Sequence, residues 1–300
     1  MTLDELTRRF AIGSQVRFRE IADGVIVAHV ANQHALATIA LQGAHVASFQ
    51  PRGEEPVFWL SPHATFARGT HLLGGVPICW PWFGPHATDR TWPVHGFART
   101  VPWQVLETAT RPDGATVLRF GLVESGATRA QWPHPSSAQL EVTVGAALRV
   151  ELVTANTGEQ PFTLGEALHA YFRISDVGNV TIRGLEGCEY LDKVRGLARF
   201  TQHGSVVIGS EVDRVYVNTE AECVIEDTGW KRAIRIAKEG SRSTVVWNPW
   251  CDHVGGVGDF GTDGHRGTVC VESANALPNV ITLAPGDTHR LAATYSVARL

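Results

Sequence analysis

Short segments of alternating apolar and polar residues, separated by turn signals, recur along this chain of 300 residues. In residues 148–153 (LRVELV), apolar side chains alternate with Arg149 and Glu151, which is the period-two pattern of a half-buried strand. Residues 222–225 and 234–237 lie on either side of the turn sequence Asp-Thr-Gly and predict a hairpin. This periodicity favours a protein built mainly from strands.

Further strand-like segments extend the pattern over the whole chain. Candidate strands lie at 25–30, 35–41, 56–60, 115–123, 139–144, 162–174, 180–185, 244–247, 268–272, 280–283 and 291–295. The last two flank the turn signal APGD at 284–287. Many short strands with turns between them indicate an all-β sandwich or barrel. No linker-like change of composition divides the chain, so we expect a single domain over residues 1–300.

The N-terminal residues 1–12 are the exception and predict a short helix. Thr2 and Glu5 have the spacing of a capping box, and Leu3, Leu6 and Phe10 share one helical face. This start lacks the basic and then apolar pattern of a secretory signal, so we expect a cytoplasmic protein.

Charge and composition exclude several classes of function. The formal net charge is −4 and no stretch is dense in Lys or Arg, which disfavours nucleic-acid binding. No apolar run is long enough to span a bilayer, so no membrane partner is expected. Five cysteines, odd in number and widely spaced, argue against a disulfide framework or a zinc site.

The chemistry is expected in three unusual segments, residues 74–99, 165–173 and 269–275. Glu272 stands in the apolar run VCVESAN, and burial there would raise its pKa and make it a base near neutral pH. His169 lies among apolar and aromatic residues and can transfer protons near pH 7. Alternatively, Glu272 faces water and His169 is a hydrogen-bonded core residue.

The Gly-, Pro- and Trp-rich segment 74–99 adds further candidates. His95 occurs in a loop-like context, whereas Trp82 and Phe83 belong to an aromatic cluster that either stacks on a sugar ring or closes one end of the sandwich. No metal-binding spacing, dinucleotide fingerprint or G-x-S-x-G nucleophile motif is present. We therefore expect acid–base chemistry on a neutral polar ligand and no metal site.

Taken in order, these motifs resemble the hexose-6-phosphate mutarotase branch of the aldose 1-epimerase family. The resemblance rests on GGVPICWPWFG at 74–84, HGFAR at 95–99, LHAYF at 168–172, GL at 184–185, YLDK at 190–193, EVDRVY at 211–216, WNPW at 247–250, DFG at 259–261 and VESAN at 271–275. It extends from about residue 40 to the C-terminus.

The resemblance implies a galactose-mutarotase-like supersandwich that interconverts the α and β anomers of an aldohexose without a cofactor. Glu272 then corresponds to the general base and His169 to the general acid. His95 and Asp213 correspond to groups that hold sugar hydroxyls, and Arg99 to an arginine on the substrate or phosphate side. The implied partner is a small sugar or sugar phosphate, and we expect a monomer.

One departure from the family pattern concerns the phosphate. The phosphosugar branch commonly has an arginine directly before the Gly-Gly pair, and this chain has Leu73 there. Leucine cannot replace the bidentate contacts of a guanidinium with phosphate. Arg68 and His71 are nearby in sequence, and His253 stands where relatives often carry lysine. We still expect a hexose 6-phosphate such as glucose 6-phosphate, and a free sugar is the alternative that Leu73 leaves open.

Two other functions stay open at this point. One is a non-catalytic carbohydrate-binding or sugar-sensing sandwich, and the other is a ketose or uronate epimerase. The glycine-rich segment 255–267 is a candidate flap over the site.

Overall fold

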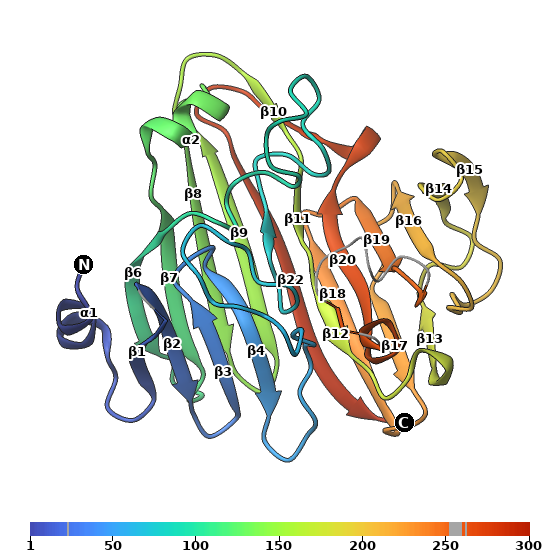
Figure 1. The fold of residues 1–300 in the computed structure, drawn as a ribbon, viewed down its shortest axis with the longest axis horizontal. Coiled ribbons are helices and arrows are strands. Elements are labelled where there is room, and N and C mark those ends of the chain that lie inside the picture. Colours follow the sequence, from blue (N-terminus) through green and yellow to red (C-terminus); the bar gives the residue numbers. More distant parts are fainter. Residues whose placement is uncertain (23, 252–259, 262) are drawn as a thin grey trace.

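The computed structural model describes residues 1–22, 24–251, 260–261 and 263–300, and antiparallel strands account for most of them. Two large sheets and one smaller sheet pack against one another (Figure 1). This arrangement confirms the predicted all-β class. No helix in the described ranges is long and apolar enough to cross a membrane.

The longest sheet extends across the whole molecule and forms its base. Its strands, in spatial order, are β13 (Val180–Arg183), β17 (Cys223–Asp227), β18 (Arg232–Glu239), β22 (Thr288–Arg299), β9 (Leu148–Asn156), β8 (Ser136–Val144), β7 (Thr116–Leu122) and β6 (Trp103–Thr110). The predicted hairpin is the antiparallel pair β17–β18. Strand β9 alternates buried and half-buried residues throughout, as its sequence predicts.

A second large sheet covers one half of this base. It contains β15 (Ala198–Thr201), β14 (Glu189–Asp192), β16 (Val212–Val217), β19 (Ser243–Asn248), β20 (Thr268–Asn275), β11 (Glu166–Leu168) and β5 (Ile78–Cys79), and β12 (Tyr171–Arg173) also pairs with β20. All eight residues of β20 are buried. Burial of an ionisable side chain in such a strand costs free energy, so Glu272 is an unusual residue within β20.

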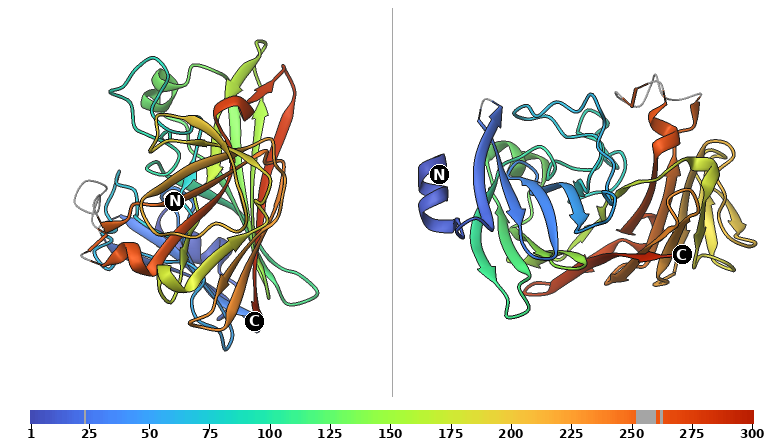
Figure 2. Two further views of the ribbon diagram at one scale, coloured as in Figure 1. Left: turned by 90° about the vertical axis from the view of Figure 1, so that its right-hand side faces the viewer. Right: turned by 90° about the horizontal axis from the view of Figure 1, so that it is seen from below.

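A four-stranded sheet covers the other half of the base, as Figure 2 shows in its right-hand view. It consists of β1 (Val16–Ala22), β2 (Val25–Ala31), β3 (Ala35–Ala40) and β4 (His45–Pro51). The remaining elements are the strand pair β10 (Phe162–Leu164) and β21 (Ile281–Leu283), the helices α1 (Leu3–Phe10) and α2 (Gly126–Gln131), and the 3-10 turns η1 (Val177–Asn179), η3 (Gly264–Gly267) and η4 (Leu277–Asn279). The expected capping box of Thr2 and Glu5 begins α1.

Several details differ from the sequence prediction. Residues 56–60 form no strand, because their backbone changes partner: Val57 bonds to Phe49, whereas Trp59 bonds to Tyr171. The segment 162–174 is divided into β10, β11 and β12, since the amides of Gly165 and His169 bond to the carbonyls of Pro81 and Pro77, which lie on either side of β5. The short helix α2 was not predicted, and β21 pairs with β10 rather than with the strand across the predicted turn.

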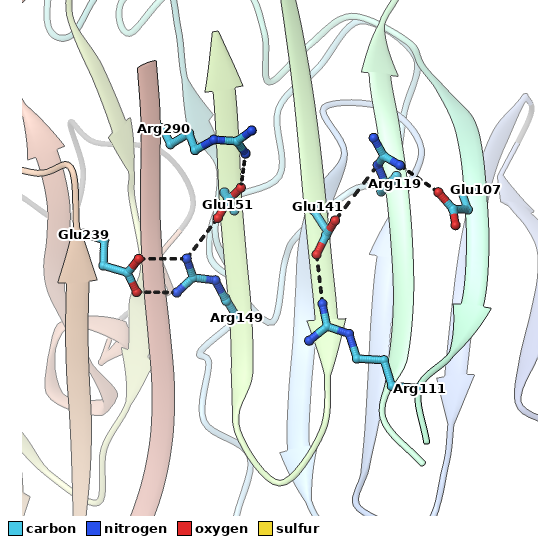
Figure 3. Close-up of polar contacts among 8 residues, drawn as sticks. All are labelled: Glu107, Arg111, Arg119, Glu141, Arg149, Glu151, Glu239 and Arg290. Atoms are coloured by element: carbon cyan, nitrogen blue, oxygen red, sulfur yellow. Dashed lines mark hydrogen bonds and ion pairs between the residues drawn. The ribbon is translucent and has the colours of Figure 1, made fainter. Parts of the chain in front are cut away.

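Charged side chains form two linked groups on the base sheet (Figure 3). Arg149 donates to both carboxylate oxygens of Glu239 and also to Glu151, which accepts a further bond from Arg290. The ladder register places Glu141 directly opposite Glu151. Because like charges in that position repel, the arginines on either side stabilise the pairing of β8 with β9.

We expect Arg149→Ala to lower the free energy of unfolding by about 1 kcal/mol, because Glu151 and Glu239 lose a shared counter-charge. The difference from wild type should shrink at about 1 M NaCl, where the Debye length falls to about 3 Å. Urea denaturation measures both effects. Arg199→Ala, which removes a more exposed pair with Glu189, is the control. If both variants lose the same free energy of unfolding, the linked contacts of Arg149 add no more stability than one exposed ion pair, which would contradict the prediction.

Candidate active site

One face of the second large sheet forms the floor of a cavity of about 370 Å³. The register places Asp213 of β16 opposite Trp247 of β19, and Val245 of β19 opposite Glu272 of β20. Opposite residues in a ladder share a face, so these side chains point to the same side. The lining consists of His71, Leu73, Phe83, Val94, His95, Arg99, His169, Tyr171, Lys193, Glu211, Asp213, Val245, Trp247 and Glu272.

A second cavity of about 400 Å³ lies at one end of β6, β7 and β8. Glu124 is the one titratable side chain in the lining described for it. It therefore offers no acid–base pair, whereas the cavity over β20 brings together carboxylates, histidines and cations. We identify the latter as the candidate active site.

Glu272 and His169 meet at the base of this cavity. The Oε1 atom of Glu272 lies 3.2 Å from Nε2 of His169, and the two side chains are 2% and 8% exposed. Oε2 of Glu272 and Nδ1 of His169 are buried without a hydrogen-bond partner among the described residues. A buried polar atom without a hydrogen-bond partner destabilises the fold. Two such atoms in one pair of contacting side chains therefore indicate a functional site.

Burial shifts the pKa values of this pair in opposite directions. It raises the pKa of the Glu272 carboxyl well above its usual range. It also lowers the pKa of the His169 imidazole, and repulsion from Arg99 adds to that effect. Both shifts disfavour the isolated charges, so the pair retains a single shared proton over a wide pH range.

Aromatic side chains and one backbone bond fix the imidazole of His169. Its ring stacks on Tyr171 at a centroid distance of 4.7 Å and an angle of 11°, and Trp247 packs edge-on against it. The amide of His169 donates to the carbonyl of Pro77. These contacts hold the His169 ring in one orientation directly after the short strand β11, on the same side as Tyr171.

His95 enters the cavity from the loop between β5 and β6. Its φ of +68° lies in the left-handed region, which few non-glycine residues adopt. The amide of Gly84 donates to Nδ1 of His95 at 3.2 Å, so the ring proton is on Nε2. The ring also packs edge-on against His169, at a centroid distance of 5.5 Å. His95 therefore presents a hydrogen-bond donor close to the acid–base pair.

The two predicted aromatic residues, Trp82 and Phe83, have different surroundings in the loop between β5 and β6. Phe83 lines the cavity and packs against His95. Trp82 does not line it: its indole donates to the carbonyl of Pro93 and its ring packs against Trp92 and Phe97. The structure therefore places Trp82 in the loop's own packing and only Phe83 at the site.

Two cations face the cavity. Arg99 lines the cavity and donates to the carbonyl of Val94. The ammonium of Lys193 lies 2.6 Å from Oδ2 of Asp213. Burial raises the pKa of Asp213, although Lys193 opposes that shift. The other oxygen of Asp213, Oδ1, is buried without a partner in the same part of the structure.

Leu73 lies at the apolar end of the cavity, packed against the cluster of Trp59, Tyr171, Phe260 and Cys270. His71 also lines the cavity. Arg68, considered above as a substitute for the missing arginine, instead lies against Gly24 on the surface.

Sequence reasoning assigned no role to Lys193 or Trp247, although both occur in the motifs YLDK and WNPW. The sequence signal for Lys193 was its place in the motif YLDK. His253 and part of the candidate flap at 255–267, namely 255–259 and 262, lie outside the described residues. In the part that the structure describes, no three His, Cys, Asp or Glu side chains gather to hold a metal ion.

Comparison with known sequences decides the family. Residues 27–296 match the family described as aldose 1-epimerase. The chain belongs to the aldose 1-epimerase family. It is therefore an isomerase of the epimerase type, which agrees with the buried contact between a carboxyl and an imidazole.

Relatives within the aldose 1-epimerase family carry a more specific name. A Salmonella typhimurium protein provisionally named glucose-6-phosphate 1-epimerase is 41% identical over 241 residues, which cover 80% of each chain. An Escherichia coli protein of the same provisional name is 37% identical over 264 residues, covering 88% of this chain and 87% of the relative.

Solved structures confirm the expected galactose-mutarotase-like fold of this aldose 1-epimerase family member. The crystal structure of a provisional mutarotase from Salmonella typhimurium matches with a TM-score of 0.90 and 36% identity, over 97% of this chain and 96% of the other. A galactose mutarotase-like protein from Clostridium acetobutylicum shares the fold at 13% identity, with a TM-score of 0.76 over 95% of this chain and 98% of its own.

Proposed function

We propose that the chain is a mutarotase that interconverts the α and β anomers of a hexose 6-phosphate, with glucose 6-phosphate as the representative substrate. The observation that carries this proposal is the contact between Glu272 and His169 at the base of a cavity that also holds Arg99 and Lys193. The provisional names of the relatives support the same substrate class.

The proposed reaction opens and closes the sugar ring. Glu272 removes the proton from the hydroxyl on C1, the bond between C1 and the ring oxygen breaks, and a carbonyl forms at C1. His169 donates its proton to the ring oxygen. Rotation about the C1–C2 bond and reversal of both transfers close the ring on the other face. General acid–base catalysis of this kind contributes about 10²- to 10⁴-fold, and no electrons leave the substrate.

The proton balance of the pair fits this cycle. Before ring opening, the proton is on His169 and Glu272 is ionised. After ring opening, Glu272 carries the proton and His169 is neutral. The pair holds one proton in both states. The protein therefore needs no exchange with bulk water during turnover. Burial favours the second state, in which both groups are neutral, so forming the ion pair before ring opening costs free energy that contacts with the substrate must offset.

Other cavity residues would bind the sugar. Arg99 and Lys193 supply positive charge for a phosphate, with Lys193 exchanging its contact with Asp213 for the ligand. His95 donates from Nε2 to a sugar oxygen, Asp213 accepts from a hydroxyl, and Phe83 covers a ring face. Leu73 contributes apolar contact where the phosphosugar branch commonly has arginine.

The test is anomer exchange measured by saturation-transfer NMR with glucose 6-phosphate, glucose and galactose in parallel. We expect clear acceleration for the phosphate ester and a smaller effect on the free sugars. Lys193→Met should reduce the rate for the phosphate more than the rate for glucose. Acceleration confined to the free sugars would overturn the phosphate preference, and no acceleration with any sugar would overturn the function.

The shifted pKa values predict a rate that is flat across neutral pH. A second proton would add to His169 only below its lowered pKa, and the last proton would leave Glu272 only above its raised pKa. We expect the kcat for glucose 6-phosphate to show no inflection near pH 6.5, the ordinary pKa of histidine. Measurement of kcat at saturating substrate between about pH 5.5 and 7.5 checks this. A kcat that halves near pH 6.5 would contradict the shared-proton interpretation.

A further inference from the structure

A third ionisable side chain on the catalytic strands lies outside the cavity. Glu166 belongs to β11, three residues before His169, and its side chain is fully buried. The ladder pairs it with Asn275 of β20, three residues after Glu272. Glu166 and Asn275 therefore join the two strands that carry the proposed acid and base.

The contacts of Glu166 extend to the base sheet. Its Oε1 accepts a hydrogen bond from Asn275 at 3.0 Å and lies 3.0 Å from Nε2 of His289, a residue of β22. The side chains of Asn275 and His289 also donate to the carbonyl of Gly240, in the turn between β18 and β19. One buried carboxylate thus connects both catalytic strands with the sheet below them.

The charge of His289 strengthens this connection. Its ring is partly buried, which disfavours the charged form, but Glu166 and the Gly240 carbonyl outweigh that effect and raise the pKa of His289. A buried carboxylate needs such a partner, because an unpaired charge in the interior is strongly destabilising.

The position of His169 depends on an unusually short strand. Strand β11 has three residues, and its other neighbour in the sheet, β5, has two. Few hydrogen bonds between strands therefore hold this part of the backbone. Its position depends more strongly on side-chain contacts such as those of Glu166. Errors of about 1 Å in the placement of a catalytic group can cost about 10²-fold in rate.

We propose that Glu166 is a positioning residue, which holds His169 and Glu272 in register by tying their strands to each other and to β22. This inference rests on the proposed mutarotase function. It assigns Glu166 no contact with the substrate and no part in proton transfer.

Two variants test the proposal, Glu166→Gln and His289→Ala, with glucose 6-phosphate as the substrate. His289 lies at the more exposed end of the cluster, so His289→Ala tests the same connection where Glu166→Gln fails to fold. We expect both to lower kcat by about 10- to 10²-fold with KM largely unchanged. His289→Gln restores a neutral donor and should recover most of the kcat.

The matched control is Asp227→Asn. Asp227 is also a fully buried carboxylate, but it accepts bonds from the amides of Ser175, Gly229 and Trp230, outside the cavity lining. This variant should lose thermal stability without losing kcat. An equal loss of kcat in Asp227→Asn would show that general destabilisation explains the effect and would overturn the positioning role.

Hydrogen exchange separates this proposal from the proposed function. Peptides that contain β11 and β20 should exchange faster in Glu166→Gln and His289→Ala than in wild type, whatever the substrate is. Unchanged exchange, or wild-type kcat in both variants, would overturn the positioning role. If wild-type protein accelerates no anomer exchange, the function is wrong and the exchange comparison alone decides whether Glu166 anchors the strands.

Discussion

Replacing Glu272 by glutamine is expected to reduce the rate of anomer exchange by about 10²- to 10⁴-fold while leaving the fold intact. The amide has nearly the same shape as the carboxyl but cannot accept the proton of the C1 hydroxyl. Because burial already disfavours the charge of Glu272, the neutral amide should leave thermal stability unchanged or raise it. NMR exchange rates and thermal unfolding measure the two effects.

The binding of glucose 6-phosphate provides the control for Glu272→Gln. A chemical-shift titration should show that the variant still binds the sugar, because the proposed phosphate contacts of Arg99 and Lys193 remain. A variant that retains wild-type exchange rates would contradict the role of Glu272 as the base. A variant that has lost both binding and structure would show that the residue serves the fold instead.

Replacing His169 by glutamine should cause a loss of the same order, about 10²- to 10⁴-fold. The amide nitrogen of glutamine occupies nearly the place of Nε2 and keeps a polar group in contact with Glu272. It cannot give up a proton to the ring oxygen, so hydrogen bonding and proton transfer are separated. Exchange within about tenfold of wild type would indicate that His169 only binds the sugar. Double replacement of His169 and Glu272 should cost little more than either change alone, since the two act as a unit.

The strands and the pair of candidate catalytic residues could be predicted because their signals are local. Alternation identifies strands such as β9, and an ionisable residue in an apolar run such as that of Glu272 is conspicuous in any sequence. Local pattern could not predict which strands become neighbours. The separation of β21 from β22 into different sheets depends on packing between segments distant in sequence.

The loop between β5 and β6 limited the prediction of binding residues. Trp82 and Phe83 are adjacent and both aromatic, yet only Phe83 reaches the cavity. The difference arises from backbone contacts such as the bond from the amide of His95 to the carbonyl of Gly84, which sequence periodicity does not predict. Lys193 was missed because a lysine after a strand is common at surfaces. The single domain, the monomeric state and the cytoplasmic location stay predictions.

The most direct test of the central claim is exchange NMR of glucose 6-phosphate in D₂O with wild type, Glu272→Gln and His169→Gln. We predict cross-peaks between the α and β anomeric protons with wild type, their loss in both variants, and no deuterium at C2 in any sample. Cross-peaks that persist in the variants, or deuterium entering C2 with wild type, would contradict a reaction confined to C1 and carried by these two residues.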